Sequence, residues 1–253
     1  MLTQIINYKF KFMRKYINYA LIAFLFLSVM ITGGCIKDFQ CIDGNGYPIT
    51  ETRTVNTFHE VVCNGSFEVN VFYGDTHEVK VDAESNLIQA IRTSVSGGRL
   101  YIDTDDNHCF NNSIPVIITV YAPNVDGLDL NGSGSVRANG IYADNLYLNI
   151  SGSGNMDVNA DALHIEARIS GSGSIDIHGI SETSELSISG SGNIFAYDLV
   201  QKRSESTISG SGNIYVTVSQ QLDGTISGSG NIYYKGNPTV FQNISGSGRI
   251  IKQ

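Results

Sequence analysis

Tryptophan is absent from the sequence, proline occurs only four times, and no acidic residue precedes Asp38. Four basic residues stand within the first 15 positions, and an apolar run follows over residues 19–31, ahead of the small residues Gly33 and Gly34. A basic region, a short apolar run and a small-residue exit are typical of a secretory signal peptide. The run is shorter than the roughly 20 residues that span a bilayer. We therefore predict that residues 1–34 are a lipoprotein signal peptide, with an uncleaved anchor helix as the alternative.

The residues around Cys35 resemble a bacterial lipobox, in which the peptide is cut before a cysteine that is then acylated. Two glycines precede the cysteine, whereas Thr32 stands where a lipobox usually has leucine. We predict that Cys35 is the lipid anchor and that residues 35–43 form a linker. A single acyl chain binds a membrane weakly, but lipoproteins of this class carry several. The residue after Cys35 is not acidic, which favours the outer membrane; whether the body faces the periplasm or the outside stays open.

Acidic residues outnumber basic ones in the remainder of the chain. The four basic residues of the signal segment leave twelve against 24 acids, a net charge of about −12. Such a charge is unfavourable for nucleic acid or anionic lipid as a partner. The chain also lacks a phosphate-binding loop, a zinc spacing and a serine–histidine–aspartate order. We predict a protein that is not an enzyme and has no cofactor; a polysaccharide-modifying enzyme is the weaker alternative.

Only three cysteines follow Cys35, at positions 41, 63 and 109. An exported protein can form disulfides, and an odd number leaves one thiol free. The pairing among Cys41, Cys63 and Cys109 is not decided by the sequence. Our prediction is a disulfide between Cys63 and Cys109.

Seven copies of one heptad occupy the second half of the chain. Each copy is Ile-Ser-Gly-Ser-Gly-Asn-Ile or a close variant, and together the copies hold 14 of the 27 glycines. Their first residues lie 18 to 20 residues apart and are Leu130, Ile150, Ile169, Ile188, Ile208, Ile226 and Ile244. A repeat at a near-fixed period indicates a solenoid in which each copy belongs to one coil.

Apolar and polar residues alternate between the copies, for example from Leu163 to Ile169, with the period of two that is typical of strands. A coil of about 19 residues has room for two or three short strands, and its apolar side chains are buried only when coils stack. We predict an all-β parallel solenoid with coils of 18–20 residues, regular over 130–253. Residues 44–129 are strand-rich without the heptad. We expect them to form irregular N-terminal turns of the solenoid, with a separate small domain as the alternative.

Stacked coils would align two outward columns of side chains. The first column stands three residues before each heptad and consists of Glu166, Glu185, Glu205 and Asp223. Carboxylates stacked about 5 Å apart repel one another unless a cation bridges them, and Ca²⁺ prefers such oxygen ligands. This column is therefore a candidate cation site. Ordinary solvated acids, offset by nearby arginine and lysine, are the alternative, and no metal is established.

The second column stands seven residues after each heptad start and contains Phe195, Tyr215 and Tyr233. Exposed aromatic residues in a row can form a surface that binds a sugar or a protein. The alternative is a cross-strand ladder that stabilises pairing by roughly 0.2–1 kcal/mol per pair. We predict this column as the candidate ligand face.

The combination of motifs resembles the bacterial auto-transporter adhesin family with a head GIN domain. The resemblance covers about residues 44–253 and rests on Gly65-Ser-Phe-Glu-Val69, Gly98-Arg-Leu-Tyr-Ile102, Ile118-Thr-Val-Tyr-Ala-Pro123 and the Ser-Gly-Ser-Gly copies. It implies a right-handed parallel β-helix on an exported, often lipid-anchored protein, and it supplies no catalytic residues.

The residues and the resemblance together predict a non-catalytic, adhesin-like envelope lipoprotein. It would present a repetitive β-helix face to a glycan or a surface protein. A structural envelope protein without a soluble ligand is the alternative. The C-terminal coil is where we expect self-association, and the membrane is reached only through lipidated Cys35.

Overall fold

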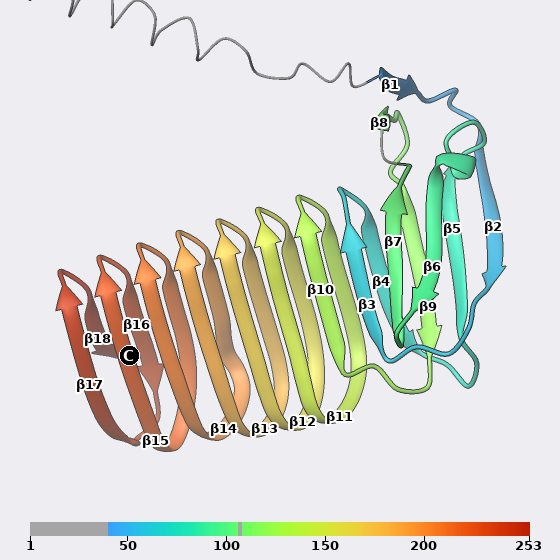
Figure 1. The fold of residues 1–253 in the computed structure, drawn as a ribbon. Helices are drawn as coiled ribbons and strands as arrows, with labels where there is room; N and C mark the ends of the chain where they lie inside the picture. The colour runs from blue at the N-terminus through green and yellow to red at the C-terminus, as the bar shows by residue number, and fades with distance from the viewer. Residues whose placement is uncertain (1–39, 106–107) are drawn as a thin grey trace, which may run out of the picture. The chain divides into compact units, whose positions relative to one another are not determined.

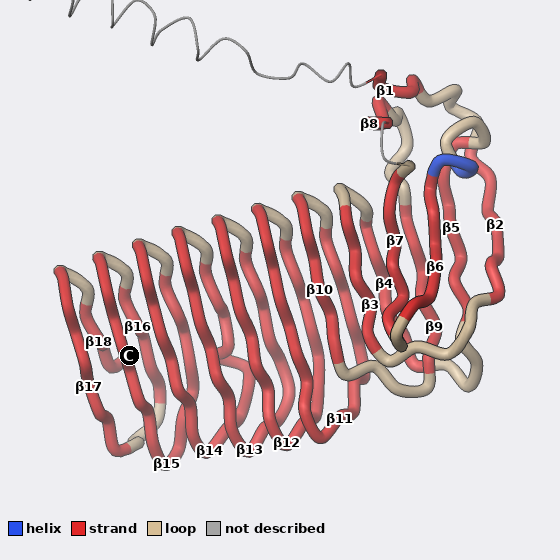
Figure 2. Tube along the Cα trace, viewed as in Figure 1, coloured by secondary structure: helices blue, strands red, loops and turns tan. Residues whose placement is uncertain are grey.

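Parallel strands stack into a β-solenoid, as the repeats predicted (Figure 1). The computed structural model describes residues 40–105 and 108–253. The predicted signal peptide and Cys35 lie outside the described residues. Strands make up almost all secondary structure of the described part (Figure 2). No helix in these two ranges is long and apolar enough to cross a bilayer.

Five long strands each follow one coil. They are β11 (Ser135–Gly152), β12 (Asn155–Gly171), β13 (Ser174–Gly190), β14 (Asn193–Gly210) and β15 (Asn213–Gly228). Shorter strands continue the two walls at either end, namely β10 (Gly127–Gly132), β16 (Asn231–Lys235), β17 (Thr239–Gly246) and β18 (Arg249–Lys252). The tight turns between strands line up along one edge of the stack, and the curved bends within strands line up along the opposite edge (Figure 1).

Equivalent heptad residues lie directly over one another. The register pairs Leu130 with Ile150 and continues through Ile169, Ile188, Ile208, Ile226 and Ile244. The predicted coil length of 18–20 residues is therefore confirmed. From Ile150 to Ile226, these side chains are at most 2% exposed. Each coil thus buries its apolar face between its two walls and against the neighbouring coils.

The heptad glycines allow each coil to lie close to the one before it. A Cβ atom at Gly173 would lie 2.4 Å from the carbonyl oxygen of Gly154 and 2.9 Å from Cγ2 of Ile150. Gly171 has a φ of +137°, a conformation that side chains rarely adopt. Its carbonyl oxygen accepts hydrogen bonds from the amides of Ser191 and Gly192 in the next coil. The glycines are therefore required by coil-to-coil contact at the turns.

Most strands within residues 40–126 extend the same two walls in a different chain order. Beyond β10, one wall continues with β3 (Glu60–Asn64), β7 (Arg99–Thr104) and β6 (Ile91–Ser96). Beyond β11, the other wall continues with β4 (Glu68–Tyr73), β9 (Ile117–Ala122), β5 (Glu78–Glu84) and β2 (Pro48–Thr54). A short 3₁₀ turn, η1 (Ile88–Ala90), precedes β6. Strands β3, β4, β7 and β9 pair in parallel, whereas β2, β5 and β6 pair antiparallel.

The connection from β3 to β4 is an eighth, degenerate copy of the heptad. Its residues are Cys63-Asn-Gly-Ser-Phe-Glu-Val69, with Phe67 in the place of the second glycine. Cys63 pairs with Leu130, and Val69 pairs with Val136. The first coil of the stack therefore begins well before the regular repeats.

The predicted disulfide between Cys63 and Cys109 is wrong. The disulfide joins Cys41 in β1 (Gln40–Asp43) to Cys109 in β8 (His108–Asn111), a small parallel pair in which these residues are register partners with Cα atoms 4.3 Å apart. Cys63 lies in the core between Leu130 and Ile102 and is 0% exposed. Burial raises the pKa of its thiol to about 12. The free thiol is thus a core side chain, because it takes the inward first position of a heptad.

Candidate functional site

The three predicted aromatic residues lie together as a stack on one wall of the solenoid. Ring centroids are 5.0 Å apart between Phe195 and Tyr215, and again between Tyr215 and Tyr233, with interplanar angles of 14° and 9°. The strand register places each ring beside the next. Neighbouring rings therefore cover the inner ring faces. On the outer side of the column, Tyr233 has Ile251 as its register partner in the next coil.

The Phe195 end of this column borders a hollow of about 250 Å³. The hollow is also lined by Arg137, Asp157 and Asp176, which occupy the same register position in the three preceding coils. Phe195 is 37% exposed. One face of this ring packs against Tyr215, and Asp176 is its register partner on the other side. An aromatic face and two carboxylates thus meet at one place on the wall.

His178 lies among three acids beside the hollow. Its Nε2 atom is 3.3 Å from a carboxylate oxygen of Asp176 and 3.5 Å from one of Asp157, and its Nδ1 atom is 3.8 Å from Asp198. Burial raises the pKa of Asp176; His178 opposes this rise, and the charges of Asp157 and Asp198 add to it. Ionised carboxylates only accept hydrogen bonds. The group therefore suits a ligand rich in hydroxyl or amide donors.

The predicted acidic column is aligned in register across four coils, as Glu166, Glu185, Glu205 and Asp223. Arg168 bridges two of its members, with Nε 2.5 Å from Glu166 and Nη2 3.2 Å from Glu185. Gln221 donates a hydrogen bond of 2.7 Å to Asp223. Within the described ranges, no three of these carboxylates bring ligand atoms within 4.8 Å of one another. Three of the four acids thus already have a protein partner, and the cation site stays a prediction.

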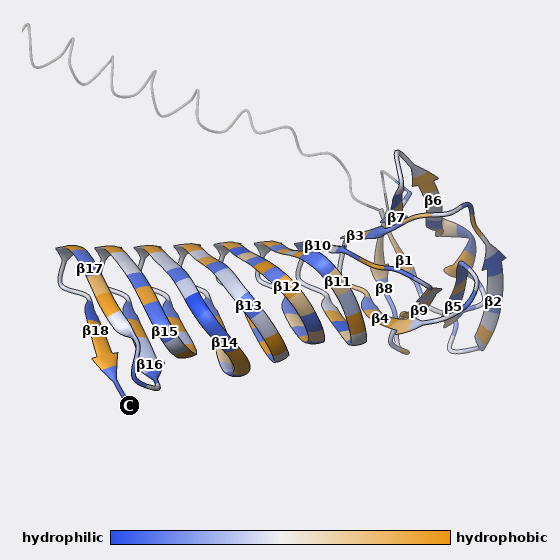
Figure 3. Ribbon diagram, turned by 90° about the horizontal axis from the view of Figure 1, so that it is seen from below, coloured by the Kyte–Doolittle hydropathy of each residue, from blue (hydrophilic) through white to orange (hydrophobic). Residues whose placement is uncertain are grey.

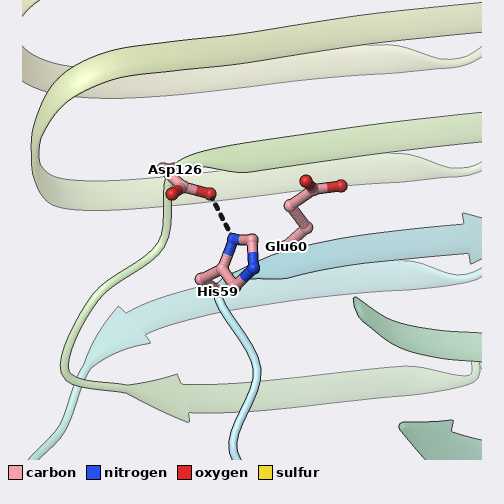
Figure 4. Close-up of side chains that lie close together, drawn as sticks. All are labelled: His59, Glu60 and Asp126. Carbon is pink, nitrogen blue, oxygen red and sulfur yellow. Dashed lines mark hydrogen bonds and ion pairs between the residues drawn. The ribbon is translucent and has the colours of Figure 1, made fainter. Parts of the chain in front are cut away.

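One group of three potential metal ligands occurs in the described part of the chain, formed by His59, Glu60 and Asp126 (Figure 4). His59 Nδ1 lies 2.9 Å from a carboxylate oxygen of Asp126, and this hydrogen bond raises the pKa of the imidazole. Glu60 is paired with Arg99 at 2.5 Å. Each group already has a charged partner in the protein. The cluster is therefore explained as an ion-pair network that joins β3, β7 and the start of β10.

Sequence reasoning singled out Phe195 but missed Arg137, Asp157, Asp176 and His178. The signal was present, because the first three stand seven residues after their heptad starts, in the same column as Phe195. A search of this column for aromatic residues alone misses the charged residues that stand at the same position in the earlier coils.

The sequence and fold of this chain can be compared with those of known proteins. The family model described as "Putative auto-transporter adhesin, head GIN domain" matches residues 57–238. The chain belongs to this family. An adhesin is an exported protein that binds at the cell surface, so the family agrees with an exported, adhesin-like module.

Solved structures of three bacterial proteins share the fold. A "putative adhesin" from Bacteroides fragilis is 24% identical, with a TM-score of 0.78 over 84% of this chain and 100% of that one. A "putative lipid binding protein" from Parabacteroides distasonis is 27% identical, with a TM-score of 0.73 over 85% and 100%. A "putative adhesin" from the same species is 26% identical, with a TM-score of 0.67 over 85% and 100%. None of the curated proteins matches the chain.

Proposed function

We propose that the protein is an adhesin-like binding module of the cell envelope, anchored through acylated Cys35, and that it has no catalytic activity. Family membership supports an exported adhesin. The stacked coils supply a rigid body with outward columns of side chains. The ligand side of the proposal rests on one observation, the hollow that lies between Phe195 and the carboxylates of Asp157 and Asp176.

The chemistry of this hollow fits a sugar. The face of an aromatic ring is electron-rich and attracts positively polarised C–H groups such as those of a pyranose. Carboxylates accept hydrogen bonds from hydroxyl groups, and the guanidinium of Arg137 can donate to a ring oxygen or an acidic substituent. The hollow of about 250 Å³ is smaller than ligand pockets of roughly 300–1,000 Å³. It therefore suits about one sugar ring at a time.

Glycan-array binding by the mature protein tests this proposal. We expect binding to a defined set of glycans, and Phe195→Ala or Asp176→Asn should each weaken it by about tenfold or more, which corresponds to roughly 1.4 kcal/mol. Tyr47→Ala is the matched control, because Tyr47 is 72% exposed and does not line the hollow.

Two outcomes would count against a sugar ligand. The first is equal glycan binding by the wild type and Phe195→Ala. The second is an array without any signal together with binding to neutral phosphatidylcholine vesicles, which would favour a lipid, the ligand class named for one structural neighbour.

The anchor has its own test. Cells fed radiolabelled palmitate should incorporate label into the wild type and not into Cys35→Ala, and protease treatment of intact cells reports which side of the outer membrane the body faces. Label in Cys35→Ala would show that the anchor is elsewhere.

A structural role without a soluble ligand is the second candidate. In β17, Phe241 is 55% exposed and Ile244 is 38% exposed, although Ile244 is stacked on the buried Ile226. These apolar side chains could meet a second copy of the protein. Sedimentation velocity should then show a dimer that Phe241→Ser and Ile244→Ser abolish; a monomer at all concentrations would rule this out.

A further inference from the structure

The bends lie on the edge of the solenoid opposite the Ser-Gly turns (Figure 1). A groove runs along three of them. It is formed by the bends of β11, β12 and β13 and by the segment before β10, and its volume is about 890 Å³. Large apolar side chains in this bend groove are exposed: Tyr142 is 71% exposed, Leu163 58% and Ile180 60%. Figure 3, viewed from this side, shows hydrophobic stretches interspersed with hydrophilic ones along the curved strands.

Register shifts occur at these bends between β11 and β12 and between β13 and β14, whereas β12 and β13 pair without one. The pairing of β11 with β12 shifts between Asn139 and Ile141, where Gly140 has a φ of +71°. A one-residue shift reverses the side to which a strand residue points. Ile180 also pairs with Val200, which is 62% exposed, so the apolar surface continues into the next coil. Adjoining exposed apolar residues on successive coils indicate an interaction site, unlike single exposed ones.

The charge of the bend groove has one sign. Four carboxylates line it, from Asp126, Asp144, Asp161 and Glu182, and none of the lysines and arginines in the described part of the chain does. Asp126 is paired with His59, and Glu182 with Lys202 at 2.7 Å. Asp144 and Asp161 have no charged or hydrogen-bonded partner in the described part of the chain. Uncompensated negative charge therefore lies beside exposed apolar surface.

We propose that the bend groove binds an extended segment of a partner protein in which apolar side chains alternate with lysine or arginine. Tyr142, Ile180 and Val200 share one register column, in which Asp161 lies between Tyr142 and Ile180. Successive coils lie about 4.8 Å apart, so a strand-like segment can lie along this column. Its apolar side chains would face this column, and the long, flexible stems of its lysine or arginine side chains would bend back to Asp144 and Asp161. Complementary charge increases the rate and specificity of such binding.

Charge also disfavours the other possible occupants. A second copy would bring a body with 23 acids against 11 basic residues over 40–253, which is the same sign as the groove. Anionic lipid would be repelled for the same reason. The site lies on the bend edge, whereas the Phe195 hollow lies on a wall, and it does not depend on the proposed glycan binding.

Fluorescence anisotropy with a labelled Lys-Leu-Lys-Val-Lys-Leu-Lys peptide tests the proposal on the mature protein. We expect binding that weakens at high salt and is about tenfold tighter than that of a Lys-Ser-Lys-Ser-Lys-Ser-Lys peptide. The double variant Asp144→Asn/Asp161→Asn should weaken binding roughly fivefold. Leu163→Ser/Ile180→Ser should remove the preference for leucine over serine. These four side chains lie at the surface, so the variants should unfold at the same urea concentration as the wild type.

Matched controls separate the groove from general surface charge. Glu205→Gln/Asp223→Asn removes two acids from outside the groove and should leave peptide binding unchanged, as should Phe195→Ala. The proposal is overturned if the serine peptide binds equally well, or if the groove variants bind the leucine peptide like the wild type. It is also overturned if Ile180→Ser dissociates a wild-type dimer, which would make a second copy the occupant, or if neutral vesicles displace the peptide.

Discussion

Alanine at Gly190 is a direct test of why the heptad contains glycine. Gly190 ends β13 and has a φ of +131°. A Cβ atom there would lie 2.3 Å from the carbonyl oxygen of Gly171 and 3.1 Å from its carbonyl carbon. These are backbone atoms of the preceding coil, so no side-chain rotation can relieve the contact. The two coils would have to move apart at the turn.

Two contributions set the expected loss of stability. A residue other than glycine in so sparsely populated a backbone conformation costs about 1–3 kcal/mol. Separation of the coils would also weaken the hydrogen bonds that the amides of Ser191 and Gly192 donate to Gly171, at 2.9 and 3.2 Å. A buried polar group left without its partner costs about 1–3 kcal/mol. We therefore expect Gly190→Ala to lower the free energy of unfolding by about 2–6 kcal/mol.

Urea unfolding followed by circular dichroism measures this loss, with Gly140→Ala as the control. Gly140 also has a positive φ, +71°, but no atom lies within 4 Å of the position of an added Cβ. Its replacement should cost only the backbone conformation, about 1–2 kcal/mol. Equal losses in the two variants would refute the role of the neighbouring coil.

Three further predictions concern the N-terminal strands. Cys41→Ser removes the disulfide to Cys109, whose two residues are 68 positions apart in the sequence, and should lower the free energy of unfolding by up to about 4 kcal/mol. Urea unfolding of this variant should no longer depend on reductant. Continued dependence would contradict the pairing. Hydrogen bonds, chiefly from the Ser113 side chain, lower the pKa of Glu84, so the stability that ionised Glu84 contributes is present above about pH 4.5 and is lost as pH falls through its folded-state pKa. Glu84→Gln should therefore destabilise the protein at neutral pH and make its stability depend less on pH in the acid range. An unchanged acid dependence would refute this. Because Asp126 raises the pKa of His59, an NMR titration should give a value above 6.5 that falls in Asp126→Asn, and stability from this pair should be full below pH 6.5 and decline as pH rises through the folded-state pKa.

The stacking of the regular coils could be predicted from the sequence because every copy of the heptad aligns with the next copy in the same register. Ile188 and Ile208 lie 20 residues apart, and their pairing follows once the repeat is taken as one coil. The periods of 18 to 20 did not obscure this, since the differences in length are taken up at the bends. Register shifts occur there, between Asp176 and Gly179 and between Ala196 and Val200.

The first coil and the strands beyond it could not be predicted in the same way. Phe67 replaces the second glycine of the degenerate heptad, so the copy that begins at Cys63 does not match the others by sequence. Strand β7 lies between β3 and β6, although β6 precedes it in the chain. Alternation predicts strands but not which strands pair. The true partner of Cys109 depends on that pairing, because β1 and β8 meet only in the folded protein.

Only part of the candidate ligand face could be predicted from the sequence. The column from Phe195 to Tyr233 follows from register alone, whereas the stacking of its rings depends on side-chain rotamers. The bend groove could not be predicted from the sequence. Tyr142, Leu163 and Ile180 stand at different distances from their heptads, so the repeat does not show that they line one groove.

The two edges of the solenoid differ in how freely their sequence can vary, and this difference indicates where specificity resides. At the turns, contact between coils restricts the heptad to glycine, and the outward serines are the same in nearly every copy. A ligand that met only this edge would find no feature to distinguish one coil from the next. On the walls and bends the outward residues change from coil to coil, from Arg137 through Asp157 to Phe195 in one column. A partner that recognises one place on this protein therefore has to bind where the outward residues differ between coils, as they do at both the Phe195 hollow and the bend groove.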